Sequence, residues 1–253
     1  MKLTDITPVL LTFNEADNLQ RTLEGLKWAQ QIIIVDSGST DDTRRIAEAF
    51  PQVRWLTRAF DDFASQRNFG LDAVNTAWVL SLDADHHLSA ELVSELASLD
   101  DQHCQAFFAA FKYQIWQQSV RCAILPARPV LFRNASCRYQ PDGHAEHLMI
   151  DGRHGQLVHP VTHDDRKPLS RWVSAQDGYA QREAEKLRTA EVLGRADKIR
   201  RITWLAPLAV FFYVLIIRGG IFEGRRGFFY AYQRLLAEVN LALHLMQNEA
   251  DSV

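Results

Sequence analysis

The sequence predicts an α/β protein in which a mostly parallel sheet is flanked by helices and followed by a helical C-terminal region. Short apolar runs alternate with amphipathic stretches over the first hundred residues, which is the pattern of a parallel sheet covered on both faces. The β-branched run 32–35 is typical of such a doubly covered strand. Because the pattern becomes helical near residue 170, we expect a sheet domain over 1–170 and a helical region over 171–253.

Composition excludes several classes of protein. The chain has 253 residues, 47% of them hydrophobic, which is enough for one large or two small folded domains. A net charge of −3 gives no reason to expect nucleic acid as a partner. Cys104, Cys122 and Cys137 are odd in number and lack C-x-x-C spacing, so we expect neither disulfides nor a zinc site, and a reducing cytosolic compartment. The first residues lead directly into a strand, and no secretion signal is expected.

The individual elements are predicted from local signals. Leucines at helical spacing and polar capping residues mark the helices between the strands. Strands are expected at 6–13, 32–35, 53–56 and in the run from Trp78, and the helix caps at Asn14, at Ser39 or Thr40, and at Ser89. Further strands at 105–116 and 128–132, followed by turn signals, predict an antiparallel or mixed extension of the sheet.

Two carboxylates, Asp83 and Asp85, end the apolar run that begins at Trp78. Side chains at i and i+2 of an extended chain point the same way, so both should face one point at the carboxyl edge of the sheet, where α/β proteins bind ligands. Two hard oxygen ligands suit Mg²⁺ or Mn²⁺ and leave room for phosphate oxygens. The pair therefore predicts a metal-diphosphate site; the alternative is an acidic pair in a solvated turn.

Another carboxylate, Asp36, ends the run 32–35 and opens a tight turn around Gly38. A carboxylate there can accept a hydrogen bond from a base N–H or a ribose hydroxyl, while the turn directs backbone N–H groups at an anionic ligand. The alternative is a well-capped strand-to-helix turn without a ligand.

The loop histidines could suggest a metal cluster. Glycine and proline interrupt the stretch that carries them, so it fits no H-x-x-x-H helix, and loop histidines are usually polar surface; they stand at 144, 147, 154, 159 and 163. His163 is a better candidate, because its neighbours Asp164, Arg166 and Lys167 favour a phosphate or metal contact.

The apolar segment 202–217 contains no charged residue, and arginines bound it. At sixteen residues it is short for a bilayer-spanning helix, which needs about 20. A buried core helix is one alternative. We favour an in-plane or re-entrant membrane anchor, because the flanking cations suit anionic headgroups and the aromatic residues at 228–232 suit the headgroup level.

Four motifs, in this order, resemble those of the family 2 glycosyltransferases of the GT-A fold. They are Leu11-Thr12-Phe13-Asn14-Glu15, Val35-Asp36-Ser37-Gly38-Ser39-Thr40-Asp41-Asp42-Thr43, Gln66-Arg67-Asn68-Phe69-Gly70 and Leu82-Asp83-Ala84-Asp85. Beyond them, residues 143–151 and 163–172 resemble the bacterial branch that adds sugars to the lipopolysaccharide core.

The resemblance implies a Rossmann-like, nucleotide-sugar-binding catalytic domain and assigns roles to single residues. Asp36 would hold the base or the ribose, and Arg67 would lie near the diphosphate. Asp83 would bind the nucleotide and the cation, and Asp85 would be the principal metal ligand. The remaining residues of the nucleotide site are Thr12, Asn14 and Glu15.

In such enzymes an acidic residue further along the chain takes the proton from the acceptor hydroxyl. The candidate is Glu146, although Ala145 stands where related chains often have histidine. Asp142 is the second choice.

The implied function is an inverting, metal-dependent hexosyltransferase at the cytoplasmic face of the bacterial inner membrane. Its donor would be a nucleotide sugar, with UDP as the common nucleotide of the family, and its acceptor a lipid-linked saccharide such as the lipopolysaccharide core. The alternative is a non-catalytic membrane-surface module that binds saccharide or nucleotide. An enzyme that makes nucleotide sugars usually has a glycine- and basic-rich loop after its first strand, and this chain has none there.

Overall fold

The computed structural model describes residues 1–100, 103–143, 145–190 and 192–250. They form two compact units. Unit 1 comprises Met1–Gln117, Leu125–Pro141 and Glu146–Lys167. Unit 2 comprises Gln118–Ile124, Asp142–Ala145 and the chain from Pro168 onward.

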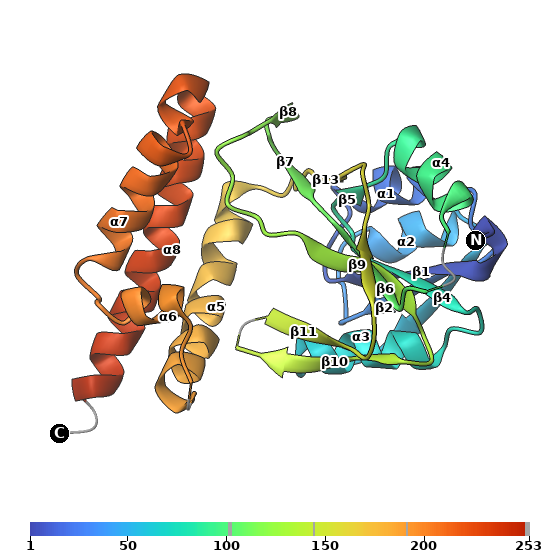
Figure 1. The fold of residues 1–253 in the computed structure, drawn as a ribbon, viewed down its shortest axis with the longest axis horizontal. Coiled ribbons are helices and arrows are strands. Elements are labelled where there is room, and N and C mark those ends of the chain that lie inside the picture. The colour runs from blue at the N-terminus through green and yellow to red at the C-terminus, as the bar shows by residue number, and fades with distance from the viewer. Residues whose placement is uncertain (101–102, 144, 191, 251–253) are drawn as a thin grey trace. The chain divides into compact units, whose positions relative to one another are not determined.

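A seven-stranded sheet forms the centre of unit 1 (Figure 1). Its strands are β1 (Ile6–Thr12), β2 (Ile32–Asp36), β3 (Val53–Thr57), β4 (Trp78–Asp83), β6 (Ala106–Ala109), β9 (Arg128–Arg133) and β12 (His154–Gln156). They lie in the order β12-β6-β9-β4-β1-β2-β3. The strands from β4 to β3 run parallel, whereas β9 is antiparallel to both of its neighbours, so the predicted mixed extension is confirmed.

Helices cover both faces of this sheet, because the side chains of its buried strands alternate between the faces. Leu10 and Ile34 pack with helices α1 (Leu19–Gly25), α2 (Thr43–Glu48) and α4 (Ala90–Ser98), which lie on one side (Figure 1). Val9 and Val35 pack on the other side with α3 (Phe63–Asp72). A short 3-10 turn, Leu3–Asp5, precedes β1.

Two smaller sheets complete the strands. One is the pair β10 (Cys137–Asp142) and β11 (Ala145–Ile150). The other has the order β5-β13-β7-β8, with β5 (His86–His87), β13 (Val161–His163), β7 (Phe111–Ile115) and β8 (Gln118–Ser119). The strand expected at 105–116 is therefore two strands, which separate at Ala110 and join different sheets.

The predicted helix caps have different outcomes. The Ser89 side chain accepts a hydrogen bond from the Leu92 N–H at 3.2 Å, so this cap is confirmed. Asn14 does not cap α1, because it adopts a left-handed conformation (φ 54°) and α1 begins only at Leu19. Helix α2 likewise begins at Thr43, beyond the caps expected at Ser39 or Thr40.

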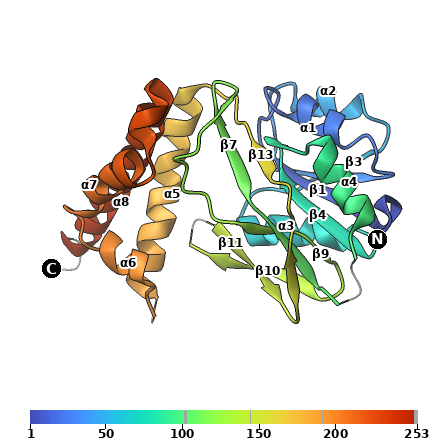
Figure 2. The same ribbon diagram turned by 45° about the horizontal axis from the view of Figure 1, so that its top comes forward.

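Unit 2 consists mainly of helices. They are α5 (Leu169–Thr189), α6 (Arg195–Arg200), α7 (Ala206–Phe212), a π-helical turn η2 (Tyr213–Ile217), a 3-10 turn η3 (Gly220–Glu223) and α8 (Arg225–Ala250). Helices α5 and α7 both pack along α8 (Figure 2). Pro207 does not interrupt α7 but lies in its first turn, where its missing N–H costs no hydrogen bond. Among the described residues, no helix has the length and apolarity needed to cross a bilayer.

The turn between α7 and α8 binds a short segment that precedes β9 in the chain. One carboxylate oxygen of Glu223 accepts hydrogen bonds from the N–H groups of Arg121 and Cys122, both at 2.8 Å. The Tyr230 hydroxyl accepts another from the Ile124 N–H at 3.0 Å. Residues 121–124 are thereby fixed to the start of α8.

Candidate active site

The carboxyl ends of β1, β2 and β4 meet at one edge of the main sheet. Thr12 of β1 is in register with Asp36 of β2, and Leu11 is in register with Asp83 of β4. The strand order β4-β1-β2 within the sheet thus gathers residues that are far apart in sequence. This edge carries the first candidate site residues.

Asp36 is buried and holds the turn that follows it. One of its carboxylate oxygens accepts from the N–H groups of Gly38 (2.9 Å) and Ser39 (2.8 Å), and the other accepts from the hydroxyls of Thr12 (2.9 Å) and Ser39 (2.5 Å). A carboxylate offers about four acceptor positions, so the protein occupies all of them. A direct contact of Asp36 with a base or ribose stays a prediction, and it requires one of these donors to move.

Asn14 and Glu15 join the two strand-to-helix loops. The Asn14 amide oxygen accepts from the Thr40 N–H at 2.7 Å, and its backbone N–H donates to the Ser39 hydroxyl at 2.7 Å. The Glu15 N–H donates to the Thr43 hydroxyl at 2.7 Å. Hydrogen bonds therefore join the loops after β1 and β2.

Asp83 and Asp85 converge, although they do not lie on one extended strand as the sequence suggests. Strand β4 ends at Asp83, and Ala84 and Asp85 lie in a turn. Both carboxylates nevertheless face the Nε2 of His86, at 3.6 Å from Asp83 and 3.7 Å from Asp85. Burial alone would raise the pKa of Asp83, but the positive charge of Arg67 lowers it to about 2. Burial is likewise outweighed at Asp85, where the neighbouring His163 holds the pKa well below its usual range.

His163 reaches the same point from the second sheet. Strand β13 pairs with β5, which places His163 beside His86, and the His163 Nε2 lies 3.3 Å from a carboxylate oxygen of Asp85. Burial opposes protonation of this imidazole, but the Asp85 carboxylate raises its pKa. Within the part of the chain that the structure describes, no group donates a hydrogen bond to the other Asp85 oxygen, Oδ1, although it is buried. A buried carboxylate oxygen without a donor fits a cation ligand.

His86 completes a group of three side chains whose ligand atoms lie within 4.8 Å of one another. Its Nδ1, however, accepts a hydrogen bond from the Asp83 N–H at 2.9 Å, so the proton of a neutral ring lies on Nε2. Burial lowers the pKa of His86 and favours this neutral ring. Because a protonated nitrogen has no lone pair for a metal, we assign His86 to orienting the two carboxylates rather than to ligation.

Arg67 lies at the other side of Asp83. Its guanidinium donates to Asp83 and to Glu146, each at 2.6 Å, and only 7% of the residue is exposed. Glu146 is thus brought to the cluster, whereas Asp142 belongs to unit 2 and pairs with Lys186 at 2.7 Å. The diphosphate contact expected for Arg67 stays a prediction, because the contacts that the structure shows are with carboxylates.

Sequence reasoning missed a buried residue that holds the His163 segment. The Asn18 side chain donates to Glu15 and to Asp165, both at 2.9 Å, and accepts from the Arg166 N–H at 2.9 Å. Lys167 then reaches Glu15 at 2.5 Å. Nothing local distinguishes Asn18 from a surface asparagine, so only the tertiary contacts identify it. His86 had a signal that could have been used, since it directly follows the carboxylate pair.

The remaining loop histidines have other surroundings. His144 lies outside the described residues. His159 binds Glu95 at 2.8 Å, and His154 packs against Phe108 with 5.1 Å between the ring centroids. Among the described histidines of this loop region, His163 alone belongs to the group around Asp85.

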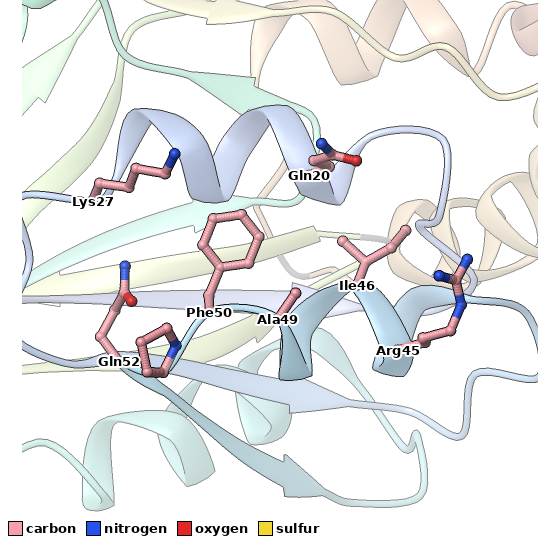
Figure 3. Close-up of a pocket in the computed structure, with 8 residues that line it drawn as sticks. Gln20, Lys27, Arg45, Ile46, Ala49, Phe50 and Gln52 are labelled. Atoms are coloured by element: carbon pink, nitrogen blue, oxygen red, sulfur yellow. The ribbon is translucent and has the colours of Figure 1, made fainter.

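A surface hollow of about 490 Å³ lies between α1 and α2, away from these residues (Figure 3). Phe50 lines it, and the Lys27 Nζ lies 6.0 Å from the centroid of the Phe50 ring. None of the candidate site residues contributes to its lining. We therefore place the site at the sheet edge and not in this hollow.

The fold resembles that of solved GT-A glycosyltransferases. The chain resembles the mannosyltransferase PcManGT from Pyrobaculum calidifontis in complex with GDP-Man and Mn²⁺, with a TM-score of 0.57 and 14% identity over 96% of this chain and 87% of that one. It also resembles S. aureus TarS 1-349 in complex with UDP, with a TM-score of 0.50 and 14% identity over 99% and 92% of the two chains.

Sequence comparison relates the N-terminal part of the chain to one family. Residues 8–121 match the glycosyl transferase family 2 model, which confirms the resemblance that the motifs indicate. An uncharacterised glycosyltransferase of Rickettsia felis is 31% identical over 111 residues, 44% of this chain and 39% of its own. The lipopolysaccharide core biosynthesis glycosyltransferase LpsC of Rhizobium meliloti is 30% identical over 104 residues, 38% of each chain. The matches thus span about two fifths of the length of these relatives.

Proposed function

We propose that this protein is a metal-dependent, inverting glycosyltransferase that moves a sugar from a nucleotide-sugar donor to a hydroxyl of a lipid-linked saccharide. The observation that carries the proposal is the buried Asp85 Oδ1, which has no hydrogen-bond donor among the described residues and lies beside Asp83 and His163 at the sheet edge. The named ligands of the structural neighbours, GDP-Man with Mn²⁺ and UDP, support a nucleotide-sugar donor. We take UDP as the nucleotide.

Asp85 and Asp83 would hold the cation, and His163 would join them through Nε2 once the proton that Asp85 favours has left that nitrogen. When bound, a divalent ion neutralises the charge of the leaving diphosphate. The two carboxylates suit Mg²⁺ and Mn²⁺ alike, whereas an imidazole ligand favours the transition metal, so we propose Mn²⁺.

Glu146 is the proposed base, and Asp142 the second candidate. The Glu146 carboxylate accepts the proton of the acceptor hydroxyl as that oxygen attacks the anomeric carbon. The bond from the anomeric carbon to the diphosphate oxygen breaks, and its electron pair leaves with the nucleoside diphosphate. A single direct displacement inverts the anomeric configuration and needs no covalent intermediate.

The acceptor is proposed from the relatives and from unit 2. LpsC is named for lipopolysaccharide core biosynthesis, and a lipid-linked acceptor requires the enzyme to work at a membrane surface. Unit 2 exposes large apolar side chains between α6 and α8, including Trp204 (71% exposed), Ile217 (72%) and Phe222 (90%). Arg200 pairs with Glu183 and Glu238. Because residues 198–222 contain three other cationic residues and no acidic one, this surface suits an anionic bilayer at the cytoplasmic face of the inner membrane.

Asp85→Asn tests the metal role. We expect turnover to fall at least about 100-fold, measured as nucleoside diphosphate release from a panel of donors with Mn²⁺ or Mg²⁺, because a charged ligand is lost. The melting temperature and circular dichroism should stay close to those of the wild type. The matched control is Asp72→Asn, at an exposed position at the end of α3. Full transfer by Asp85→Asn would remove the proposed metal role. Nucleotide binding by the wild type without release from any donor would instead indicate the non-catalytic module.

The membrane role has a separate test. The full chain should co-sediment with vesicles containing phosphatidylglycerol, and it should do so less at high salt. Phe222→Asp should weaken this binding, whereas Val158→Asp, at a position 82% exposed in unit 1, should not. Equal partitioning of both variants and the wild type would contradict the proposed surface.

A further inference from the structure

Arg67 lies at the centre of a buried polar cluster in unit 1. Its Nε donates to Glu146, one terminal nitrogen donates to Asp83, and the other donates to the Ser81 hydroxyl at 3.0 Å. The nitrogen that donates to Ser81 also lies 3.4 Å from the Leu82 carbonyl oxygen. All three nitrogens of the guanidinium therefore have protein acceptors.

The surroundings of Arg67 fix its orientation. The Tyr139 hydroxyl donates to the same Ser81 oxygen at 2.9 Å, and the Tyr139 ring lies 5.5 Å from the guanidinium carbon. Asn68, the next residue of α3, holds the backbone of Tyr139 through two hydrogen bonds of 2.9 Å. Gly70 allows α3 to approach β1, since a Cβ there would lie 2.7 Å from a methyl carbon of Val9. Residues 66–70 thus fix the position and orientation of the Arg67 side chain.

We propose that Arg67 is a positioning residue that holds the base candidate Glu146 at a fixed place relative to Asp83, and that it does not contact the donor diphosphate. The inference rests on the proposed function. A phosphate oxygen that took the place of either carboxylate would have to break a 2.6 Å contact with an arginine side chain that is only 8% exposed. Charged hydrogen bonds of this length are among the strongest that a protein makes.

The arrangement has a mechanistic consequence. Glu146 stands in β11 and Asp83 at the end of β4, and the two strands belong to different sheets. One planar guanidinium with donors in a rigid fork spans both carboxylates, which a lysine ammonium cannot do with the same geometry. Arg67 therefore sets the distance between the group that activates the acceptor and the group that lies beside the donor.

The test is a double-variant comparison of Arg67→Lys, Glu146→Gln and the combination of the two in the full chain. If Arg67 acts through Glu146, Arg67→Lys lowers kcat by about 10- to 100-fold, the range seen when a residue that orients a functional group is lost. The combined variant then loses no more than Glu146→Gln alone. Losses that multiply in the combined variant would overturn the inference.

Binding of UDP and UMP in the presence of Mn²⁺ gives a second readout that does not need turnover. Only UDP carries the second phosphate, so the ratio of the two affinities reports contacts with that phosphate. Because Arg67 is proposed to make no such contact, we expect Arg67→Lys to leave the ratio unchanged. A selective loss of UDP affinity would assign Arg67 to the diphosphate and overturn the inference. Failure of the proposed function itself would be recognised separately, as absence of transfer by the wild type with every donor.

Ser81→Ala is a second variant that tests the same inference if Arg67→Lys does not fold. It removes one acceptor of the guanidinium and leaves the charge in place. We expect a smaller fall of kcat, with the affinity for UDP unchanged and faster amide exchange in β11. Ser98→Ala, at an exposed position of α4, is the matched control. The positioning role would be contradicted if a folded Ser81→Ala variant had an unchanged kcat. Where Arg67→Lys also folds, both variants must have an unchanged kcat for this conclusion.

Discussion

Gly227 is expected to be the most sensitive glycine of unit 2. A Cβ at this position in α8 would lie 1.8 Å from the Gly220 carbonyl oxygen and 2.6 Å from its carbonyl carbon. Both contacts are with backbone atoms, so no side-chain rotation can relieve them. To reach an ordinary contact of 3.4 Å, η3 and α8 must separate by about 1.6 Å.

This separation determines the expected magnitude for Gly227→Ala. It loosens the turn that binds residues 121–124 through Glu223 and Tyr230. Overpacking of this kind costs about 3 kcal/mol, and the better helix propensity of alanine returns about 1 kcal/mol. The net loss of about 2 kcal/mol corresponds to a fall in melting temperature of about 4–8 °C for a chain of this size.

The assay is thermal unfolding of the full chain, combined with amide exchange to localise the loss to unit 2. Gly25→Ala is the matched control, since the nearest atom to its added Cβ is 3.8 Å away. We expect this control to melt within a degree or two of the wild type. If Gly227→Ala melts at or above the temperature of the wild type, the close approach of η3 and α8 is refuted.

Two further predictions concern pH and thiol chemistry. Burial acts to raise the pKa of Glu95, but the N–H groups of Val158 and His159 outweigh it and lower the pKa. Its stabilising contribution is therefore present above the unfolded pKa near 4.5 and is lost as the pH falls through the lower folded pKa. Urea unfolding between pH 6 and 3 should show a shallower loss of stability for Glu95→Gln than for the wild type, and equal slopes would contradict this assignment. Burial raises the pKa of the Cys122 thiol to about 11. In the native protein at pH 8, iodoacetamide should therefore label Cys104 well before Cys122. The reverse order, measured by mass spectrometry, would be inconsistent with the packing of Cys122.

Local sequence patterns predict the central elements well. The strands expected at 6–13, 32–35 and 53–56 are found at Ile6–Thr12, Ile32–Asp36 and Val53–Thr57. Runs of β-branched and apolar residues determine these strands locally, so no tertiary information is needed. The break at Ala110 could not be predicted, because it depends on which sheet each half joins.

The site is predicted less completely, for a physical reason. Residue type and position at a strand end are enough to select Asp36, Asp83 and Asp85. The direction of a long side chain is not encoded locally. The sequence therefore predicts that Arg67 lies in the site, but not that its guanidinium contacts Glu146 instead of a phosphate. Asn18 holds the His163 segment through contacts with Asp165 and Arg166, which are 147 and 148 positions away in the chain, and no local pattern reports them.

The position of β13 has a consequence for how such proteins can diverge. His163 is held by two backbone ladders, one to β5, which starts directly after Asp85, and one to β7. The position of this proposed metal ligand is therefore set by β5 and β7, and not by the conformation of the long connection between β7 and β13. Under the proposed function, length changes in this connection that leave Glu146 and its contact with Arg67 in place would alter the acceptor side while His163 keeps its position. Arg67 still links Glu146 to Asp83, so acceptor choice and cation binding would diverge independently only through changes that leave these two contacts in place.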